Sequence, residues 1–253
     1  MARFVAVCNQ KGGVAKTTTC LSLGGSLADI GQKVLLVDLD PQANLTMSVA
    51  IQPDSLEYTV ADVVMGSTSL LSVSRVTGVR DLDIVPSNAT LAVLEKALYG
   101  RRRYEHLLKR AAMDMDPALY DYVLIDCPPS LGPLTLNALT LSELVIVPTQ
   151  AEYYALRSLQ NIFQLIRLVR DKTNAGLRYR ILVTMYDRRN SICVETLGQM
   201  RRRFASALFD AVIDVDTKLR ECPLAGVPIT VYKPSARAAL QYRALAEELL
   251  CYE

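Results

Sequence analysis

The segment that most restricts how this chain can fold is a turn with two glycines, placed between a short apolar run at residues 4–7 and a stretch of helical character. The turn reads Asn9-Gln10-Lys11-Gly12-Gly13-Val14-Ala15-Lys16-Thr17-Thr18. Glycines let successive backbone N–H groups point inward, and the N-terminus of the following helix adds positive potential. A buried strand, this turn and a helix therefore predict a loop that binds polyphosphate.

Two side chains of the turn have the chemistry for a nucleotide phosphate site. We expect Lys16 to reach the β- and γ-phosphates and the Thr17 hydroxyl to complete a Mg²⁺ shell. The general pattern G-x-x-x-x-G-K-[ST] is not met, because Gln10 and Ala15 occupy its two glycine positions. The deviant form K-G-G-x-G-K-[ST]-[ST] is met everywhere except at Ala15. The predicted nucleotide-binding residues are Lys11, Gly12, Gly13, Val14, Ala15, Lys16, Thr17 and Thr18.

Composition limits the class of protein. Lys and Arg total 28 against 26 for Asp and Glu, so net charge gives no argument for nucleic acid binding, and any basic surface must be local. Six scattered cysteines and one histidine show no metal-ligand spacing, which suits a reducing cytosol. No apolar run approaches the ~20 residues that span a bilayer. We therefore expect a cytoplasmic protein without a signal peptide.

Further apolar runs predict the fold class. They lie at residues 34–37, 83–86, 122–125, 144–148, 180–184 and, more weakly, 211–213, and stretches of helical character separate them. Continuous hydrophobicity is typical of strands covered on both faces. We predict an α/β fold with a mostly parallel twisted sheet flanked by helices on both faces, as in P-loop NTPases. No linker or repeat is evident, so residues 1–253 are expected to form a single domain.

Three carboxylates follow two of these runs. Asp38 and Asp40 come after residues 34–37, and Asp126 follows residues 122–125. Ligand groups gather at the carboxyl ends of strands in such a sheet, and phosphoryl transfer to water needs a held Mg²⁺ and an aligned water. Asp126 is a Walker-B-type candidate that touches Mg²⁺ through water, and Asp38 is a second candidate for that shell. We expect Asp40 to position the attacking water, the alternative being a turn residue before Pro41.

The extra lysine at the start of the turn, Lys11, needs a different explanation. In a monomer it has no obvious phosphate to reach, since Lys16 already occupies the cradle. A lysine at this position makes sense if it crosses to a second subunit and neutralises charge on that subunit's nucleotide. Lys11, Lys16 and Asp40 are therefore the predicted catalytic residues.

Four motifs, in this order and spacing, closely resemble the small ParA-type, Soj-like partition ATPases with a deviant Walker A loop. The motifs are Lys11 to Thr18, Val37-Asp38-Leu39-Asp40-Pro41-Gln42-Ala43-Asn44, Ile125-Asp126-Cys127-Pro128-Pro129-Ser130 and Gln150-Ala151-Glu152-Tyr153-Tyr154-Ala155-Leu156. The resemblance spans nearly the whole chain, including residues 218–223 and 226–229.

The resemblance implies a cycle. ATP and Mg²⁺ close a sandwich dimer in which Lys11 acts across the interface, and hydrolysis is slow and stimulated by a partner, usually a ParB-type centromere-binding protein. The ATP-bound dimer binds double-stranded DNA without sequence preference. Family members move chromosome, plasmid or protein cargo over the nucleoid, so the resemblance implies a nucleoid-associated protein.

Candidate DNA-binding residues come from two sources. Arg189 and Lys218 match positions that contact DNA in the family. Arg201, Arg202 and Arg203 are added from charge alone, although an arginine run on a helix is more often a solvated face. Phosphate contacts of this kind give sequence-independent, salt-sensitive affinity.

The chain departs from the family at two places. Ala15 replaces a glycine where phosphate, loop backbone and the facing subunit crowd together, which predicts slower dimerisation or hydrolysis rather than their loss. Asp214 and Asp216 stand before Lys218 where basic residues are common, which predicts a partly acidic DNA face.

Three rival functions share the phosphate loop. A MinD-like membrane-positioning ATPase needs a basic amphipathic C-terminal helix, whereas residues 236–250 show the spacing of a core-packing helix. A reductase of the nitrogenase iron protein type needs two cysteines per subunit for a shared cluster, and Cys127 has no suitable mate. An amidating or ligating ATPase needs a metabolite pocket, and Lys11 favours the partition branch instead. A non-hydrolysing DNA-binding module would leave Asp40 and Asp126 without a role.

Overall fold

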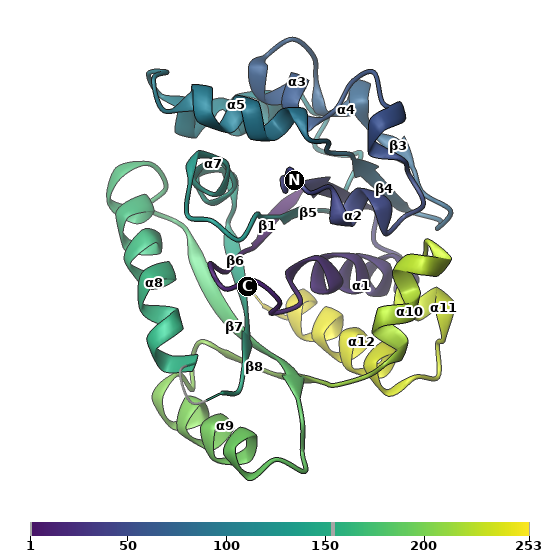
Figure 1. Cartoon of the computed structure of the whole chain (residues 1–253), viewed down its shortest axis with the longest axis vertical. Helices are drawn as coiled ribbons and strands as arrows, with labels where there is room; N and C mark the ends of the chain where they lie inside the picture. The colour runs from purple at the N-terminus through teal and green to yellow at the C-terminus, as the bar shows by residue number, and fades with distance from the viewer. Residues whose placement is uncertain (1, 153–154, 253) are drawn as a thin grey trace.

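The computed structural model describes residues 2–152 and 155–252 and is built around one eight-stranded sheet (Figure 1). The strand order is β3-β4-β2-β5-β1-β6-β7-β8, and every neighbouring pair is parallel except β3 and β4. The strands are β1 (Arg3–Val7), β2 (Val34–Asp38), β3 (Arg75–Val76), β4 (Leu82–Val85), β5 (Tyr122–Asp126), β6 (Leu144–Gln150), β7 (Arg178–Tyr186) and β8 (Leu208–Asp214).

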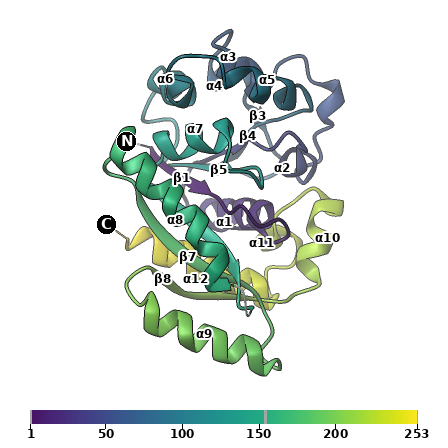
Figure 2. The ribbon, with the colours of Figure 1, turned by 60° about the vertical axis from the view of Figure 1, so that its left-hand side comes forward.

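Helices cover both faces of the sheet (Figures 1 and 2). One face packs against α1 (Lys16–Asp29), α2 (Asn44–Met47), α10 (Lys218–Ala225), α11 (Ile229–Tyr232) and α12 (Arg237–Leu250). The other face packs against α3 (Val60–Met65), α4 (Leu70–Val73), α5 (Thr90–Leu98), α6 (Leu107–Met113), α7 (Pro133–Leu141), α8 (Ala155–Lys172) and α9 (Ser191–Arg203). Short 3₁₀ turns lie at Pro53–Ser55 and Tyr104–His106.

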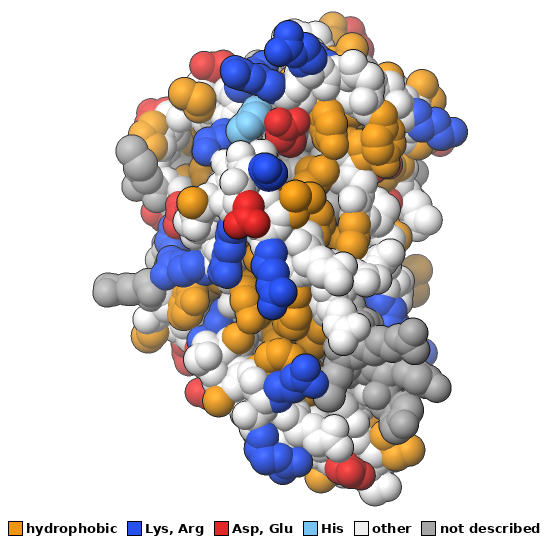
Figure 3. Space-filling view, turned by 90° about the vertical axis from the view of Figure 1, so that its left-hand side faces the viewer, with side chains coloured by type: hydrophobic (Ala, Val, Ile, Leu, Met, Phe, Trp, Pro, Cys, Tyr) orange, Lys and Arg blue, Asp and Glu red, His pale blue; other side chains and the backbone are white. Residues whose placement is uncertain are grey.

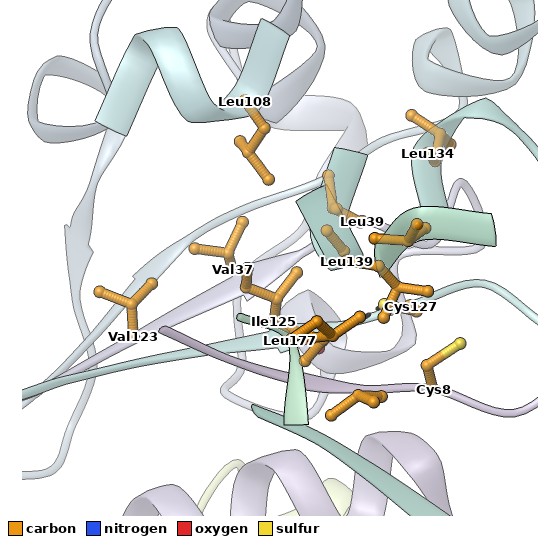
Figure 4. Packing of buried hydrophobic residues seen from close by; sticks show 14 of the residues in the cluster. Cys8, Val37, Leu39, Leu108, Val123, Ile125, Cys127, Leu134, Leu139 and Leu177 are labelled. Atoms are coloured by element: carbon orange, nitrogen blue, oxygen red, sulfur yellow. Dashed lines mark hydrogen bonds between the residues drawn. The ribbon is translucent and has the colours of Figure 1, made fainter. Parts of the chain in front are cut away.

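Successive strand residues supply two separate apolar cores. In β1, Val5 and Val7 belong to the core under α1 and α12, whereas Ala6 and the following Cys8 belong to the opposite core. Figure 4 shows part of that second core, where Cys8 and Cys127 lie among leucine, valine and isoleucine side chains. Side chains alternate between the two faces of a strand. Because helices cover both faces of β1, the residues on each face must be apolar. This arrangement explains the unbroken hydrophobic runs.

The predicted α/β class with a mostly parallel sheet is confirmed. The stretch of helical character predicted after the turn is the helix Lys16–Asp29, and the predicted last helix at 236–250 spans Arg237–Leu250. Patterning missed β3, because two residues at a sheet edge, one partly buried and one exposed, carry no periodic signal. In the described part of the chain, no helix combines the length and apolar character needed to cross a membrane.

Two adjacent glycines bring α1 close to the sheet and to α11. A Cβ atom on Gly25 would lie 2.5 Å from the Cγ of Pro228, and one on Gly24 would lie 2.8 Å from a Leu36 methyl group. Both distances are shorter than atomic contact allows. Because Gly24 and Gly25 have no side chain, α1 and the loop at its N-terminus can lie this close to the sheet.

Candidate active site

The predicted site residues converge at the carboxyl ends of three adjacent strands. Asp126 on β5 is paired in register with Val7 of β1 on one side and with Asp38 of β2 on the other. The loops that follow these strands surround a cleft of about 590 Å³, whose lining includes Gly12, Gly13, Ala15, Lys16, Thr17, Thr18 and Asp40. The parallel sheet thus brings together groups that are more than one hundred residues apart.

The loop reaches its shape through two residues with left-handed backbone. Gly13 has φ 72°, and Ala15, the residue before α1, has φ 64° and ψ 37°. Glycine adopts this region freely, whereas alanine is strained there by about 1–2 kcal/mol. The departure at Ala15 is therefore a backbone strain as well as an added methyl group.

Lys16 lies at the start of α1 with its ammonium group turned back over the loop. It is 7% exposed, and its Nζ donates to the carbonyl oxygen of Lys11 over 3.4 Å. None of the ion pairs within the described ranges includes Lys16. A buried ammonium group held by one long hydrogen bond is suited to bind an anion in the cleft.

Thr17 and Asp126 form a close polar contact within the site. The Thr17 hydroxyl donates to Oδ2 of Asp126 over 2.6 Å, while Oδ1 of Asp126 is buried without a hydrogen-bond partner. Burial, and then the charge of Asp38, raise the pKa of Asp126 well above its usual range. A divalent cation would stabilise this carboxylate in its charged form, so these two residues fit a Mg²⁺ shell.

Asp38, the second candidate for the Mg²⁺ shell, accepts hydrogen bonds at both of its carboxylate oxygens. Its Oδ1 accepts the Asp40 N–H at 3.1 Å, and its Oδ2 accepts the Thr46 N–H at 2.9 Å and the Thr46 hydroxyl at 2.7 Å. Burial raises the pKa of Asp38 from 3.8 to about 6, against the effect of these hydrogen bonds. Because both oxygens already accept hydrogen bonds, Asp38 organises the loop that carries Asp40.

Asp40 lies on the wall of the cleft. It is 7% exposed, its Oδ1 accepts the Gln42 N–H at 2.9 Å, and its carbonyl oxygen accepts from the Ser87 hydroxyl at 2.9 Å. The turn interaction expected as an alternative is therefore present. This turn hydrogen bond uses Oδ1 of Asp40, and none of the hydrogen bonds described for Asp40 includes its Oδ2.

Lys11 is held within its own chain. Its Nζ donates to Oε1 of Gln150 at 3.0 Å and to Oε2 of Glu152 at 2.6 Å, and the Gln150 amide also donates to the Gly13 carbonyl oxygen at 3.1 Å. The end of β6 thus ties down the loop at two points. This part of the fourth motif lies beside the phosphate loop, whereas Tyr153 and Tyr154 fall outside the described residues.

A second, apolar cavity of about 290 Å³ adjoins the loop, and sequence patterning did not reveal it. Gly13, Ala15, Thr18 and Pro223 line both this cavity and the larger cleft. The remaining wall is mostly apolar and includes Met185, Ile213, Val215, Leu219 and Tyr242. The lining comes from the ends of β7 and β8 and from α10 and α12. No local motif signals it, because its parts meet only in the folded chain.

The candidate DNA-binding residues Arg189 and Lys218 each pair with a nearby carboxylate. Arg189 makes a two-point contact with Asp187 at 3.0 and 3.1 Å, which lowers the pKa of Asp187. The Lys218 ammonium group lies 2.9 Å from a carboxylate oxygen of Glu221. Both side chains are substantially exposed, so the pairs can exchange for phosphate partners.

The three arginines of α9 do not form one surface. Arg201 lines a cavity with Arg188, whereas Arg203 lines another with Arg167 and Arg170 of α8. Residues two apart on a helix point in roughly opposite directions. Arg201 and Arg203 therefore face different cavities, and the prediction that Arg201, Arg202 and Arg203 contact DNA stays a prediction.

Of the two aspartates expected to make the face before Lys218 partly acidic, Asp214 is buried, whereas Asp216 is only partly buried. Asp214 is 1% exposed and lies 2.9 Å from Arg188 and 3.2 Å from Arg237. Asp216 accepts the backbone N–H groups of Lys218 and Ala238, where α10 and α12 begin. The surface at Asp214 is formed by arginine side chains above a buried carboxylate.

Comparison with known proteins gives a consistent result. A family model described as an AAA domain matches residues 2–179. The sporulation initiation inhibitor protein Soj of Bacillus subtilis is 40% identical over 250 residues, covering 98% of each chain. The chromosome partitioning protein ParA of Caulobacter vibrioides is 38% identical over 253 residues, covering 99% of this chain and 95% of the relative.

Solved structures share the fold. A cobyrinic acid a,c-diamide synthase from Mycobacterium smegmatis, with bound ATP analog and magnesium, has a TM-score of 0.86 and 37% identity, covering 99% of this chain and 95% of that one. Apo McdA from Cyanothece has a TM-score of 0.85 at 17% identity, covering 98% and 100%, and shows the fold alone. With the phosphate loop, the strand-end carboxylates and full-length similarity to Soj and ParA, this chain belongs to the ParA family of P-loop partition ATPases.

Proposed function

We propose that the cleft binds Mg·ATP and hydrolyses it to ADP and phosphate, and that residues 1–253 act as one ATPase unit. The observation that carries this proposal is the arrangement of Lys16, Thr17 and Asp126 around one end of α1. A cation, a hydroxyl and a carboxylate with a partnerless oxygen are the groups that a Mg²⁺-bound triphosphate requires.

Each residue has a defined part in this reaction. Lys16 neutralises charge on the β- and γ-phosphates, as do the loop N–H groups. Thr17 and Asp126 hold the metal, which polarises the phosphoryl oxygens when bound. Within the described residues no three His, Cys, Asp or Glu side chains cluster as a metal site, so phosphate and water oxygens must complete the shell. Asp40 orients the water for in-line attack.

The adjoining apolar cavity suits the adenine ring. The cavity shares Gly13, Ala15, Thr18 and Pro223 with the phosphate cleft, so one nucleotide can occupy both. Its apolar lining can pack against a planar base. In this arrangement ATP spans from the ends of β1 and β5 to the ends of β7 and β8.

Substitutions of Lys16 and Asp40 separate binding from hydrolysis. Lys16→Ala is expected to lose ATP binding, measured with a fluorescent ATP analogue. Asp40→Ala should retain binding and lose hydrolysis by about 100-fold or more, measured by phosphate release. Lys33→Ala, at an exposed site before β2, is the control. Wild-type hydrolysis in the Asp40 variant would remove Asp40 from the mechanism.

We propose that ATP closes a dimer whose formation frees Lys11 from Glu152 to contact the facing subunit's nucleotide. The half-exposed ion pair contributes only about 0.2–1 kcal/mol, so a polyphosphate can displace it. Size-exclusion chromatography with light scattering on Asp40→Ala in Mg·ATP tests this. Monomer alone under these conditions would refute the dimer.

The proposed dimer binds double-stranded DNA through Arg189 and Lys218, with Arg188 and Arg201 extending the surface and Arg202 a weaker addition. Support comes from the exposed side chains near the ends of β7 and β8 and from the buried position of Asp214. The double variant Arg189→Ala with Lys218→Ala should lose affinity for duplex DNA in ATP and low salt, and show a shallower salt dependence. The paired Arg101→Ala with Arg102→Ala is the matched control. Unchanged affinity in the first variant would exclude this surface.

The cellular role that fits these properties is cargo segregation over the nucleoid, reset by a ParB-like or cargo-adaptor protein that stimulates hydrolysis. Similarity to Soj and ParA along the full chain supports this role over membrane positioning. Addition of a candidate partner with DNA should raise the hydrolysis rate, and an unstimulated rate with every adaptor encoded nearby would argue against it.

A second candidate is an amidating activity, because one similar structure is that of a cobyrinic acid a,c-diamide synthase. Such an enzyme must hold a second substrate beside the phosphates, where Lys11, Gln150 and Glu152 already form a connected contact. Incubation with ATP, an amide donor and cobyrinic acid distinguishes the two. Amide product would favour this candidate, and ATP-dependent DNA binding would favour partition.

A further inference from the structure

A hollow of about 310 Å³ lies between α8, α9 and the start of β7, away from the strand ends that carry the nucleotide cleft. It is lined by Gln160, Phe163, Ile166, Arg167, Arg170, Tyr179, Arg203 and Phe204. Figure 3 views the side of the molecule that carries α8 and α9, and there Lys and Arg side chains surround an apolar area. None of the lining residues belongs to the proposed ATP site.

Aromatic rings form one wall of the hollow. The ring of Phe163 is 5.0 Å from that of Tyr179 and 5.7 Å from that of Phe204, measured between centroids, and all three rings are only partly buried. Tilted aromatic pairs of this kind form a firm surface. Their partial exposure leaves ring area that a planar ligand can cover.

Two of the guanidinium groups are held in place by this wall. Arg170 stacks over Tyr179 and Arg203 over Phe204, each with 5.7 Å from Cζ to the ring centroid. The Nε of Arg170 also donates to the Leu177 carbonyl oxygen over 2.6 Å. Stacking fixes each planar group and leaves its terminal N–H groups available.

The positive charge of the hollow is not balanced locally. Arg167, Arg170 and Arg203 are absent from every ion pair recorded for residues 2–152 and 155–252. Three like charges around one cavity repel one another unless an anion joins them. Arginines, rather than lysines, favour a planar or tetrahedral oxyanion that accepts paired hydrogen bonds.

We propose that this hollow binds a nucleoside monophosphate, a small ligand in which a sugar joins a phosphate to a planar base. The phosphate would lie among the three guanidinium groups, and the ring would lie against Tyr179 and the neighbouring phenylalanines. Gln160 supplies a side-chain amide at the rim for polar ring atoms.

The test uses UMP as the probe, titrated into the full chain by isothermal calorimetry. Wild type is expected to bind UMP saturably at one site, and Lys16→Ala is expected to bind it equally well. Arg167→Ala and Arg203→Ala should each weaken binding by about 10-fold or more. Arg201→Ala, on the opposite side of α9, is the matched control and should have no effect.

Two further comparisons distinguish the contribution of the ring to binding from that of the phosphate, and show that a loss of binding does not come from an unfolded variant. Inorganic phosphate alone should bind more weakly than UMP, and Tyr179→Leu should weaken UMP by a larger factor than phosphate. Arg203→Lys keeps the charge but loses the planar fork, so it should bind better than Arg203→Ala and worse than wild type. Absence of saturable UMP binding, or equal affinity in wild type and the Arg167 and Arg203 alanine variants, would overturn the proposal.

Discussion

The ammonium group of Lys11 lies 2.6 Å from a carboxylate oxygen of Glu152, which joins the start of the phosphate loop to the end of β6. The side chains are 40% and 52% exposed, so water screens their attraction. A lysine proposed to act on a second subunit is therefore retained in its own chain by a weak contact. The dimerisation equilibrium should depend on how easily this contact breaks.

Replacing Glu152 by glutamine should favour the ATP-bound dimer. Loss of a half-exposed ion pair frees each Lys11 at a gain of at most about 1 kcal/mol, and because both subunits contribute one, the dimer tightens by at most about 30-fold. Sedimentation velocity of Asp40→Ala and of the double variant with Glu152→Gln, in Mg·ATP, measures the change. Glu195→Gln on α9 is the control. A weaker dimer after Glu152→Gln would show that Glu152 contributes to the dimer itself.

Ala15→Gly should stabilise the protein, because it removes a left-handed alanine at the N-terminus of α1. The expected gain in the free energy of unfolding is about 1 kcal/mol, after the added flexibility of glycine in the unfolded chain is counted. Ala28→Gly, the same change within α1, should instead destabilise by about 0.5–1 kcal/mol. Urea unfolding of both variants without nucleotide measures whether the free energy of unfolding rises for Ala15→Gly and falls for Ala28→Gly. A loss of stability in both would mean that the Ala15 methyl packs favourably.

Gly25→Ala should destabilise the fold by about 1–3 kcal/mol, because its methyl group would meet the rigid ring of Pro228 at 2.5 Å. Gly24→Ala is the matched comparison. Its closest contact is a methyl of the flexible Leu36 side chain at 2.8 Å, which can shift, so a smaller loss is expected. Thermal unfolding of the two variants ranks them. The reverse order would show that the sheet side of α1 is packed more tightly than the α11 side.

The metal-free protein should lose stability as pH rises. The folded pKa of Asp38 is about 6 against 3.8 for the free side chain, so the folded state binds more protons between these values. The free energy of unfolding in EDTA should therefore fall from about pH 4 to pH 6. The buried Asp126, whose pKa is also raised, changes stability in the same direction. Urea midpoints of wild type and Asp38→Asn check this, and an equal slope in both would exclude Asp38 as the source.

Most of the phosphate site was predictable from sequence because its parts are local. A strand, a turn with Gly13 and a lysine at a helix start are contiguous, and parallel strands must end at the same edge of a sheet. The position of Asp126 beside Thr17 follows from those two rules. The edge strand β3 was not predictable, since two residues are too few to show a period.

The sequence by itself therefore determined the fold class, the phosphate loop and the strand-end carboxylates, because each depends on residues next to one another in the chain. Only the tertiary structure decided that Lys11 pairs with Glu152, that Asp214 is buried beneath two arginines and that Arg201 and Arg203 face different cavities. Those outcomes depend on strand order and on how each helix is rotated against the sheet. Both are set by packing between distant segments, which a local pattern does not record.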